Sequence, residues 1–158
     1  SQEICKASER VTAIAFGCED FITDLQGIHD EEHLSIYTPR ALISMAARAN
    51  GIIPIDTVHI NVHDLKDLEK NLDIAKKLGF EGMLVLNPKE LDLVHKYFSP
   101  NEDEVKDARE MLLLYEESQK HGKGVALKNN KFIGPPMVSM AKKILNKHKM
   151  ILNKNKNE

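Results

Sequence analysis

The chain of 158 residues contains no tryptophan, and aromatic residues make up only 5% of it. Because 42% of the residues are nevertheless hydrophobic, the chain can bury a core, and we expect that core to be aliphatic and to contain methionine. The two cysteines are too few for a disulfide scaffold, and they fit a reducing compartment.

Strong net charge and long apolar runs are also missing. The formal net charge is −2, which gives no reason to expect nucleic acid or an anionic membrane as the main partner. No apolar stretch approaches the roughly 18 residues that span a bilayer, and no segment resembles a signal peptide. The sequence starts at Ser1 rather than at a methionine, so it does not indicate a compartment.

Residues 11–97 alternate between short apolar runs and amphipathic segments, at the spacing of consecutive βα units. This alternation predicts parallel strands with helices on the outer face. The predicted strands are residues 11–16, 52–60 and 83–86, and the predicted helices are residues 38–50, 65–78 and 91–97.

The segment between the first strand and the first of these helices, residues 17–36, is predicted to be a long acidic loop. Thr38 and Pro39 are a typical cap and first residue of a helix, so we expect the helix to begin there. Asp64 is expected to cap the following helix, and Gly79 to end it.

The C-terminal third has a different pattern. We expect a long helix over 101–122, a hairpin over 124–133 with Asn129 and Asn130 in its turn, and a helix over 137–148. The domains expected are therefore a partial barrel over 1–100, a helix–hairpin–helix extension over 101–150 and a disordered tail over 151–158.

Three βα units cannot close a parallel barrel, and they leave two exposed parallel edges. We therefore expect the chain to be the C-terminal part of something larger, completed by an N-terminal half or by other chains.

Ala15 to Phe21 is the stretch most indicative of function. An apolar run stops at Gly17 and is followed by Glu19 and Asp20, as at the carboxyl end of a buried strand, where barrels bind ligands. The two acids are candidates for a metal site, and the alternative is a pair of solvated acids at a helix N-terminus.

This stretch opens an ordered series of motifs that resembles the citrate lyase beta-subunit-like family, a group of the HpcH/HpaI aldolase superfamily. The matching segments are residues 13–25 (AIAFGCEDFITDL), Arg40 with residues 46–51 (AARANG), residues 55–58 (IDTV), residues 78–82 and 85–88 (LGFEG, VLNP), residues 98–105 (FSPNEDEV) and residues 122–127 (GKGVAL). The series covers almost the whole chain.

The resemblance implies the C-terminal part of a (β/α)₈ TIM barrel, about strands six to eight, with a helical extension. It implies a carbon–carbon lyase that cleaves or forms a 3-hydroxyacyl thioester of coenzyme A or an acyl carrier, with a 2-oxo acid or acetyl product and Mg²⁺. It also implies a trimer or hexamer, in the cytoplasm or in mitochondria. Asp20 matches one metal ligand of the family, and the other, a Glu of strand five, has no counterpart here.

Four further residues are candidates for substrate binding: Glu19, Asp56, Asn87 and Pro88. Asp56 stands in an apolar strand, where a carboxylate is costly unless paired. It either positions substrate or pairs with Arg40 or Arg48. Asn87-Pro88 either faces the barrel mouth or forms a turn that positions the next helix.

Three positions depart from the family pattern. Gly134 stands where the family commonly has an Asp that serves as an acid/base group in a neighbouring subunit, and glycine cannot transfer a proton. Met83 and Asn87 replace a Lys and a His. The alternative is thus a non-catalytic member that binds a thioester or a partner subunit. The chain by itself is expected to be inactive.

The histidines carry little signal. His29 and His33 are four residues apart, but the segment lacks the helical apolar face of a zinc-protease motif. His59 and His63 are interpreted as ordinary, partly buried side chains.

Overall fold

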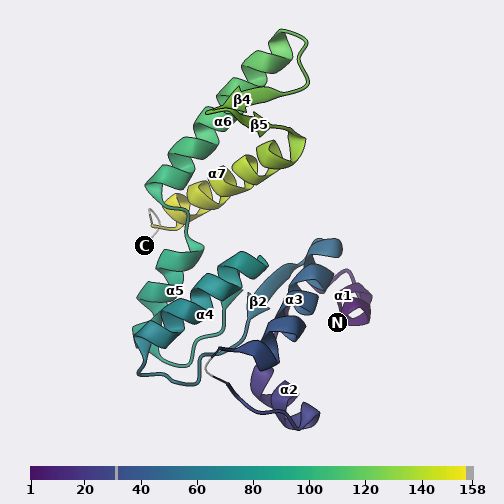
Figure 1. The fold of residues 1–158 in the computed structure, drawn as a ribbon, viewed down its shortest axis with the longest axis vertical. Coiled ribbons are helices and arrows are strands. Elements are labelled where there is room, and N and C mark those ends of the chain that lie inside the picture. The colour runs from purple at the N-terminus through teal and green to yellow at the C-terminus, as the bar shows by residue number, and fades with distance from the viewer. Residues whose placement is uncertain (31, 156–158) are drawn as a thin grey trace. The chain divides into compact units, whose positions relative to one another are not determined.

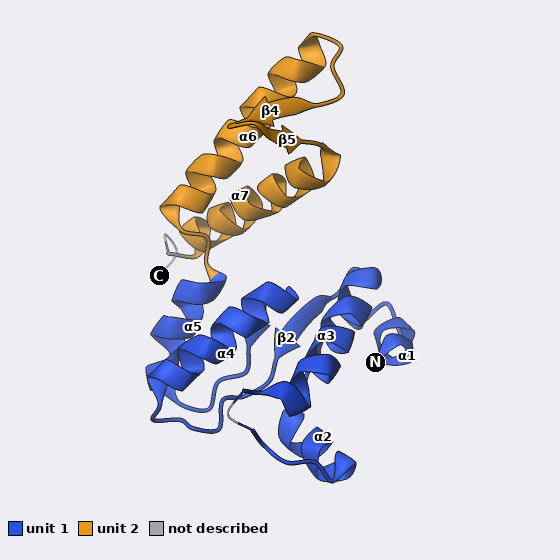
Figure 2. Cartoon of the chain, in the orientation of Figure 1, with its two compact units in different colours: residues 1–98 blue, residues 99–158 orange. Residues whose placement is uncertain are grey.

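The computed structural model describes residues 1–30 and 32–155, and Figure 1 shows the order of its elements. They fall into two compact units, residues 1–98 and 99–158 (Figure 2).

The first unit is built on a parallel sheet in the order β1-β2-β3. Ala13 pairs with Ile53, and Ile55 pairs with Gly82. The strands are β1 (Ala13–Ala15), β2 (Ile53–Asp56) and β3 (Gly82–Met83), and the helices are α1 (Gln2–Lys6), α2 (Cys18–Leu25), α3 (Leu34–Ala49), α4 (Leu65–Leu78), the short 3₁₀ helix η1 (Pro88–Glu90) and α5 (Leu91–Phe98). The predicted α/β class is thereby confirmed, although each strand is shorter than its apolar run.

One face of this sheet is covered and the other is not. Helices α3 and α4 cover the buried face (Figure 1), where Ala47 of α3 and Leu68 and Leu72 of α4 are fully buried. Burying each leucine contributes roughly 1.5–3 kcal/mol. On the opposite face Ala13, Ala15 and Ile53 remain exposed. Because parallel sheets normally bury both faces, the unit has the architecture of a part of a larger sheet.

The prediction of a loop over 17–36 was wrong, because α2 occupies its first half. Ile22 of α2 is buried beside Phe16, and the Phe21 ring meets Phe16 edge-on at a centroid distance of 5.6 Å. Gln26 ends the helix in the left-handed conformation at φ 56°. Acidic residues in the first turn suit the positive end of the helix dipole, so the acids that indicated a loop instead begin a helix.

The predicted start of α3 was also wrong. Thr38 and Pro39 lie inside the helix, which begins at Leu34. The carboxylate of Asp30 accepts hydrogen bonds from the backbone N–H groups of Leu34 and Ser35, both at 2.9 Å. Those bonds satisfy donors that the first turn of a helix leaves free, and they place the start four residues earlier.

The predicted caps of α4 are confirmed. Asp64 accepts from the backbone N–H groups of Lys66 and Asp67, and Gly79 ends the helix at φ 88°. These two ends depend on local hydrogen bonding and backbone freedom, which explains why the sequence predicts them well.

The second unit packs the hairpin of β4 (Ala126–Lys128) and β5 (Lys131–Ile133) with α6 (Glu102–Lys120) and α7 (Pro135–Asn155). The predicted turn is confirmed, with Asn129 and Asn130 at φ 47° and 60°, as a two-residue turn requires. Helix α7 continues to Asn155, so residues 151–155 are helical rather than part of a disordered tail. Residues 156–158 lie outside the described part of the chain.

Within the described part of the chain, none of the helices combines the length and the apolarity that crossing a membrane requires.

Candidate functional site

A hollow of about 670 Å³ opens at the carboxyl end of the sheet in the first unit. Four segments line it: the start of α2, the residues before α3, the stretch that follows β2, and the first two turns of α4. Ligand sites of parallel sheets form at this end, because the loops that follow the strands converge there.

Asp20 lies exposed in the first turn of α2, directly after the carboxyl end of β1. A Cβ atom at Gly17 would lie 3.4 Å from Asp20 Oδ2, so the carboxylate folds back toward the end of the strand. Within the described residues, no hydrogen bond or ion pair engages the Asp20 carboxylate. Its oxygens are therefore open to a ligand.

The first turn of α2 is attached to the end of β2. The backbone N–H of Cys18 donates to Thr57 Oγ1 at 3.3 Å, and Thr57 is buried. Burial raises the pKa of the Cys18 thiol to about 11, which makes it inert as a nucleophile. Cys18 is thus a packed side chain that holds its helix in place.

Glu19 lines the hollow and is partly exposed. One carboxylate oxygen, Oε2, lies 3.1 Å from Nε2 of His29, and the other accepts from the Cys18 thiol at 3.2 Å. His29 also lines the hollow, so the start of α2 and the loop after it meet there.

The sequence left open whether Asp56 positions substrate or pairs with an arginine, and in the structure it is paired. Its carboxylate accepts hydrogen bonds from Arg40 of α3, with Arg40 Nε at 3.1 Å from Asp56 Oδ1, and both side chains are fully buried. Burial raises the pKa of Asp56, and the hydrogen bonds from Arg40 offset only part of that rise. Asp56 lies on the helix-covered side of the sheet and is not among the residues that line the hollow.

Asn87 and Pro88 form the start of η1. The Asn87 side chain accepts from the backbone N–H of Lys89 at 3.1 Å and donates to the carbonyl of Val62 at 3.2 Å. Pro88 stands at the first position of η1, where its missing N–H costs nothing. Both residues have the arrangement of the turn that positions the next helix.

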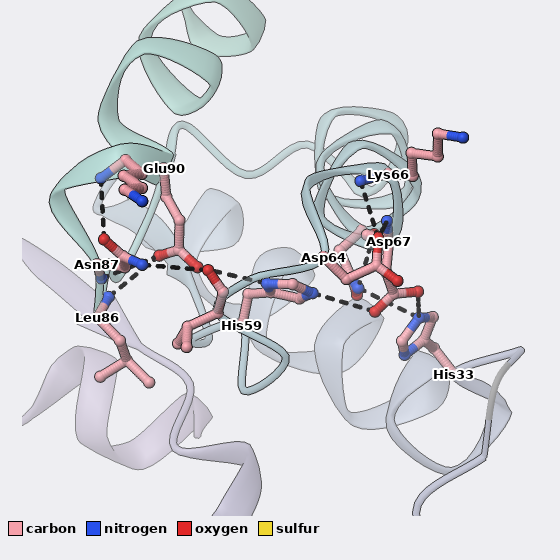
Figure 3. Close-up of polar contacts among 11 residues, drawn as sticks. His33, His59, Asp64, Lys66, Asp67, Leu86, Asn87 and Glu90 are labelled. Atoms are coloured by element: carbon pink, nitrogen blue, oxygen red, sulfur yellow. Dashed lines mark hydrogen bonds and ion pairs between the residues drawn. The ribbon is translucent and has the colours of Figure 1, made fainter.

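Figure 3 shows a chain of histidines and carboxylates that was not predicted from the sequence, and its members His33, His59 and Asp67 line the hollow. His59 is buried between Asp67, whose Oδ2 is 3.1 Å from Nε2, and Glu90, whose Oε1 is 3.4 Å from Nδ1. His33 Nε2 lies 3.5 Å from the other oxygen of Asp67. Both ring nitrogens of His59 thus face carboxylates.

This chain of contacts joins the residue before α3, the stretch after β2, helix α4 and η1. Burial raises the pKa of Asp67, but the hydrogen bond from His59 and the charge of His33 outweigh it, so that pKa lies below its ordinary value. Glu90 Oε2 accepts from the backbone N–H groups of Leu86 and Asn87 at 3.2 and 3.3 Å. These His, Asp and Glu residues are separated in the sequence, so their alternation can be recognised only after the fold brings them together.

Gly134 belongs to the second unit, where it follows β5. A Cβ atom at this position would lie 2.6 Å from the edge of the Phe132 ring, so any side chain would require that ring to move. The absence of an acid at this position is therefore accompanied by an aromatic ring that fills the space beside it.

Within residues 1–30 and 32–155, no three His, Cys, Asp or Glu side chains gather closely enough to form a complete metal site. Asp20 can thus serve only as part of a ligand set.

Comparison with known families decides the relationship. Residues 1–88 match the family described as HpcH/HpaI aldolase/citrate lyase, which is more than half of the chain. The chain belongs to this family.

Among curated members of the HpcH/HpaI aldolase/citrate lyase family, the citrate lyase subunit beta of Haemophilus influenzae is 33% identical over 149 residues, 94% of this chain and 51% of that protein. A (3S)-malyl-CoA thioesterase of Cereibacter sphaeroides is 28% identical over 145 residues, 92% of this chain and 51% of that protein. The chain therefore spans about half the length of the curated relatives it matches.

A solved structure shares the fold. The CitE protein of Mycobacterium tuberculosis, in complex with magnesium, acetoacetate and coenzyme A, superposes with a TM-score of 0.76. The match covers 93% of this chain and 55% of the CitE chain, at 23% sequence identity. The fold of this chain is thus a part of the CitE fold, which agrees with its half-covered sheet.

Proposed function

We propose that this chain is the C-terminal part of a Mg²⁺-dependent carbon–carbon lyase of the citrate lyase beta type. The substrate class is a 3-hydroxyacyl thioester of coenzyme A or an acyl carrier, cleaved to an acetyl or related thioester and a 2-oxo acid. In this proposal β1, β2 and β3 are strands six to eight of a TIM barrel. Family membership and the relatives named citrate lyase subunit beta support it.

The observation that carries the proposal is the position of Asp20. It lies in the first turn of α2 at the carboxyl end of β1, its carboxylate has no partner within the described residues, and Cys18 and Glu19 of the same turn line the hollow. Asp20 itself is exposed and lies just outside the lining of the hollow, next in sequence to Glu19, so its unengaged carboxylate is available to a cation in a way that the buried Asp56 is not.

The residues present fit one share of a magnesium site. Mg²⁺ keeps several waters and needs only one or two protein carboxylates in addition to substrate oxygens. Asp20 would hold the ion from this chain, and the second carboxylate would come from the part of the barrel that precedes it. The bound ion would polarise the oxygens of the substrate. Glu19 is proposed to orient groups in the hollow, while Asp56, Asn87 and Pro88 shape the site through Arg40 and η1.

A second candidate function is thioester binding without catalysis, and Gly134 favours it. In such a member the proton-transfer group would be absent, and the Phe132 ring beside Gly134 would fill its place. Under this alternative, Gly134→Asp combined with Phe132→Leu, which makes room for the new side chain, would create activity from almost none. If the native protein is already an active lyase, the same pair of changes should raise its activity little.

We further propose that the complete protein is a homo-oligomer, a trimer or a hexamer. The proposal rests on the resemblance, and sedimentation analysis of the complete protein tests it.

The test of the main proposal uses the native protein that contains this chain, stripped of metal and then assayed with added Mg²⁺ on citryl, citramalyl and malyl thioesters. Asp20→Asn should lower Mg²⁺-dependent cleavage by at least about 100-fold and weaken Mg²⁺ binding in calorimetry, because one charged ligand is lost. Asp24→Asn is the matched control, since Asp24 is an exposed acid one turn later in the same helix.

Two results would contradict the proposal. One is a wild-type protein that cleaves none of these thioesters with Mg²⁺ present. The other is an Asp20→Asn variant that keeps the metal affinity and turnover of Asp24→Asn.

A further inference from the structure

We propose that His29, held by Glu19, is the proton-transfer group of this site. The inference rests on the proposed lyase function and deepens it, because it assigns within the first unit a role that Gly134 cannot fill. It removes the need for an acid from a neighbouring subunit.

The reaction needs a group that first accepts a proton and then returns it. The neutral imidazole accepts the proton of the 3-hydroxyl group as the bond between carbons 2 and 3 breaks. The electron pair of that bond passes to the thioester as an enolate, and the hydroxyl carbon becomes the carbonyl of the 2-oxo acid. The imidazolium then gives the same proton to carbon 2, so the imidazole ends neutral and no further reactant is consumed.

Imidazole suits this role at neutral pH, because its ordinary pKa of about 6.5 allows both protonation states. A proton-transfer histidine needs one ring nitrogen held in a fixed orientation and the other directed at substrate. The histidines of the hollow can be compared on that requirement.

His59 fails it, because both ring nitrogens face carboxylates and the side chain is only 3% exposed. His33 also has one held nitrogen, Nε2, which lies near Asp67 and 3.2 Å from the Asn71 side-chain amide, but its side chain is only 18% exposed. His63 is exposed rather than partly buried as predicted, and it is not among the residues that line the hollow. None of these three combines a held nitrogen with a well-exposed side chain at the hollow.

His29 lines the hollow with one nitrogen held and the other unengaged. Its Nε2 lies 3.1 Å from Glu19 Oε2, its side chain is 47% exposed, and Nδ1 makes no hydrogen bond within the described residues. Glu19 adjoins Asp20 in the first turn of α2, so the carboxylate that orients the imidazole and the proposed metal ligand are held by the same helical turn.

The other charged or titratable groups around the hollow must be considered in any pH profile. They are Asp30, His33, His59, Asp64, Lys66, Asp67 and Lys70. Asp30, Asp64 and Asp67 are engaged by backbone N–H groups or histidines, so Glu19 is the carboxylate that faces the His29 ring.

The test compares His29→Gln with His63→Gln in the native protein. Glutamine keeps a polar side chain but cannot shuttle a proton, and an exposed ion pair such as Glu19–His29 contributes little to stability, so both variants should fold. His29→Gln should lower kcat for thioester cleavage by about 10²–10⁴-fold and leave KM and Mg²⁺ affinity within about twofold. The acidic limb of the kcat–pH profile should disappear, and His63→Gln should match the wild type.

A second readout follows the return of the proton alone. The wild-type protein with Mg²⁺ should exchange the methyl protons of an acetyl thioester in D₂O, observed by NMR, and His29→Gln should abolish this exchange. An active wild type in which His29→Gln retains kcat, pH profile and exchange overturns this inference alone. A wild type without Mg²⁺-dependent cleavage overturns the proposed function and this inference together.

Discussion

Two carboxylates of the first unit stand at the carboxyl ends of neighbouring strands and have opposite surroundings. Asp56 is fully buried and takes two hydrogen bonds from an equally buried Arg40, so its oxygens are engaged within the protein. Asp20 follows the neighbouring strand and is exposed, and no described residue engages its oxygens. An acid that is satisfied internally stabilises the fold, whereas an acid left open at the mouth of the sheet can hold a ligand.

Between these extremes stand Asp64 and Asp30. Each accepts two backbone N–H groups at the start of a helix, and each borders the hollow. The contrast therefore predicts a graded set of effects, in which loss of stability decreases from Asp56 through the caps to Asp20.

The largest effect should come from breaking the buried pair. Arg40→Met leaves the Asp56 carboxylate buried without its partner, which should lower the free energy of unfolding by about 3–5 kcal/mol in urea denaturation. Arg48→Met is the control, because the Arg48–Glu81 pair is partly exposed and such pairs contribute about 0–1 kcal/mol. Equal losses in the two variants would show that Arg40 and Asp56 do not form the structural pair described above.

A smaller effect is expected at the cap of α4. Asp64→Ala removes the acceptor for the Lys66 and Asp67 N–H groups and should cost about 1 kcal/mol, measured by the same denaturation. Asp64→Asn, which retains a capping oxygen, should recover most of the loss. If it does not, charge rather than hydrogen bonding accounts for the role of Asp64.

The smallest effect concerns the pH dependence at the start of α3. The N–H groups of Ser35 and Leu34 lower the pKa of Asp30 to about 2 from a usual value of 3.8. Since this pKa is lower in the folded chain, the stabilisation is present above about pH 3.8 and is lost as the pH falls toward 2. NMR titration of the Asp30 carboxyl carbon should give a midpoint near 2, and a midpoint near 3.8 would show that the carboxylate does not cap the helix.

Local features of the sequence predicted much of the fold. Asp64 and Gly79 were recognised as helix ends and Asn129-Asn130 as a turn, because caps and tight turns depend on a few adjacent residues. The βα alternation gave the α/β class for the same reason. Residues 17–36 were misread because the side chains that hold α2 and start α3 are Phe16 and Asp30, whose contacts the local pattern does not reveal.

The same distinction between local sequence and tertiary structure applies to the candidate site. The sequence by itself determined the family motifs and the placement of Glu19 and Asp20 after a strand, since a residue's position along the chain is enough for both. Only the tertiary structure decided that Asp56 is engaged by Arg40, that Asn87 donates to the carbonyl of Val62, and that Glu19 meets His29 beside the hollow. Those outcomes depend on burial and on partners 10 to 25 residues away in the sequence, which only the fold brings together.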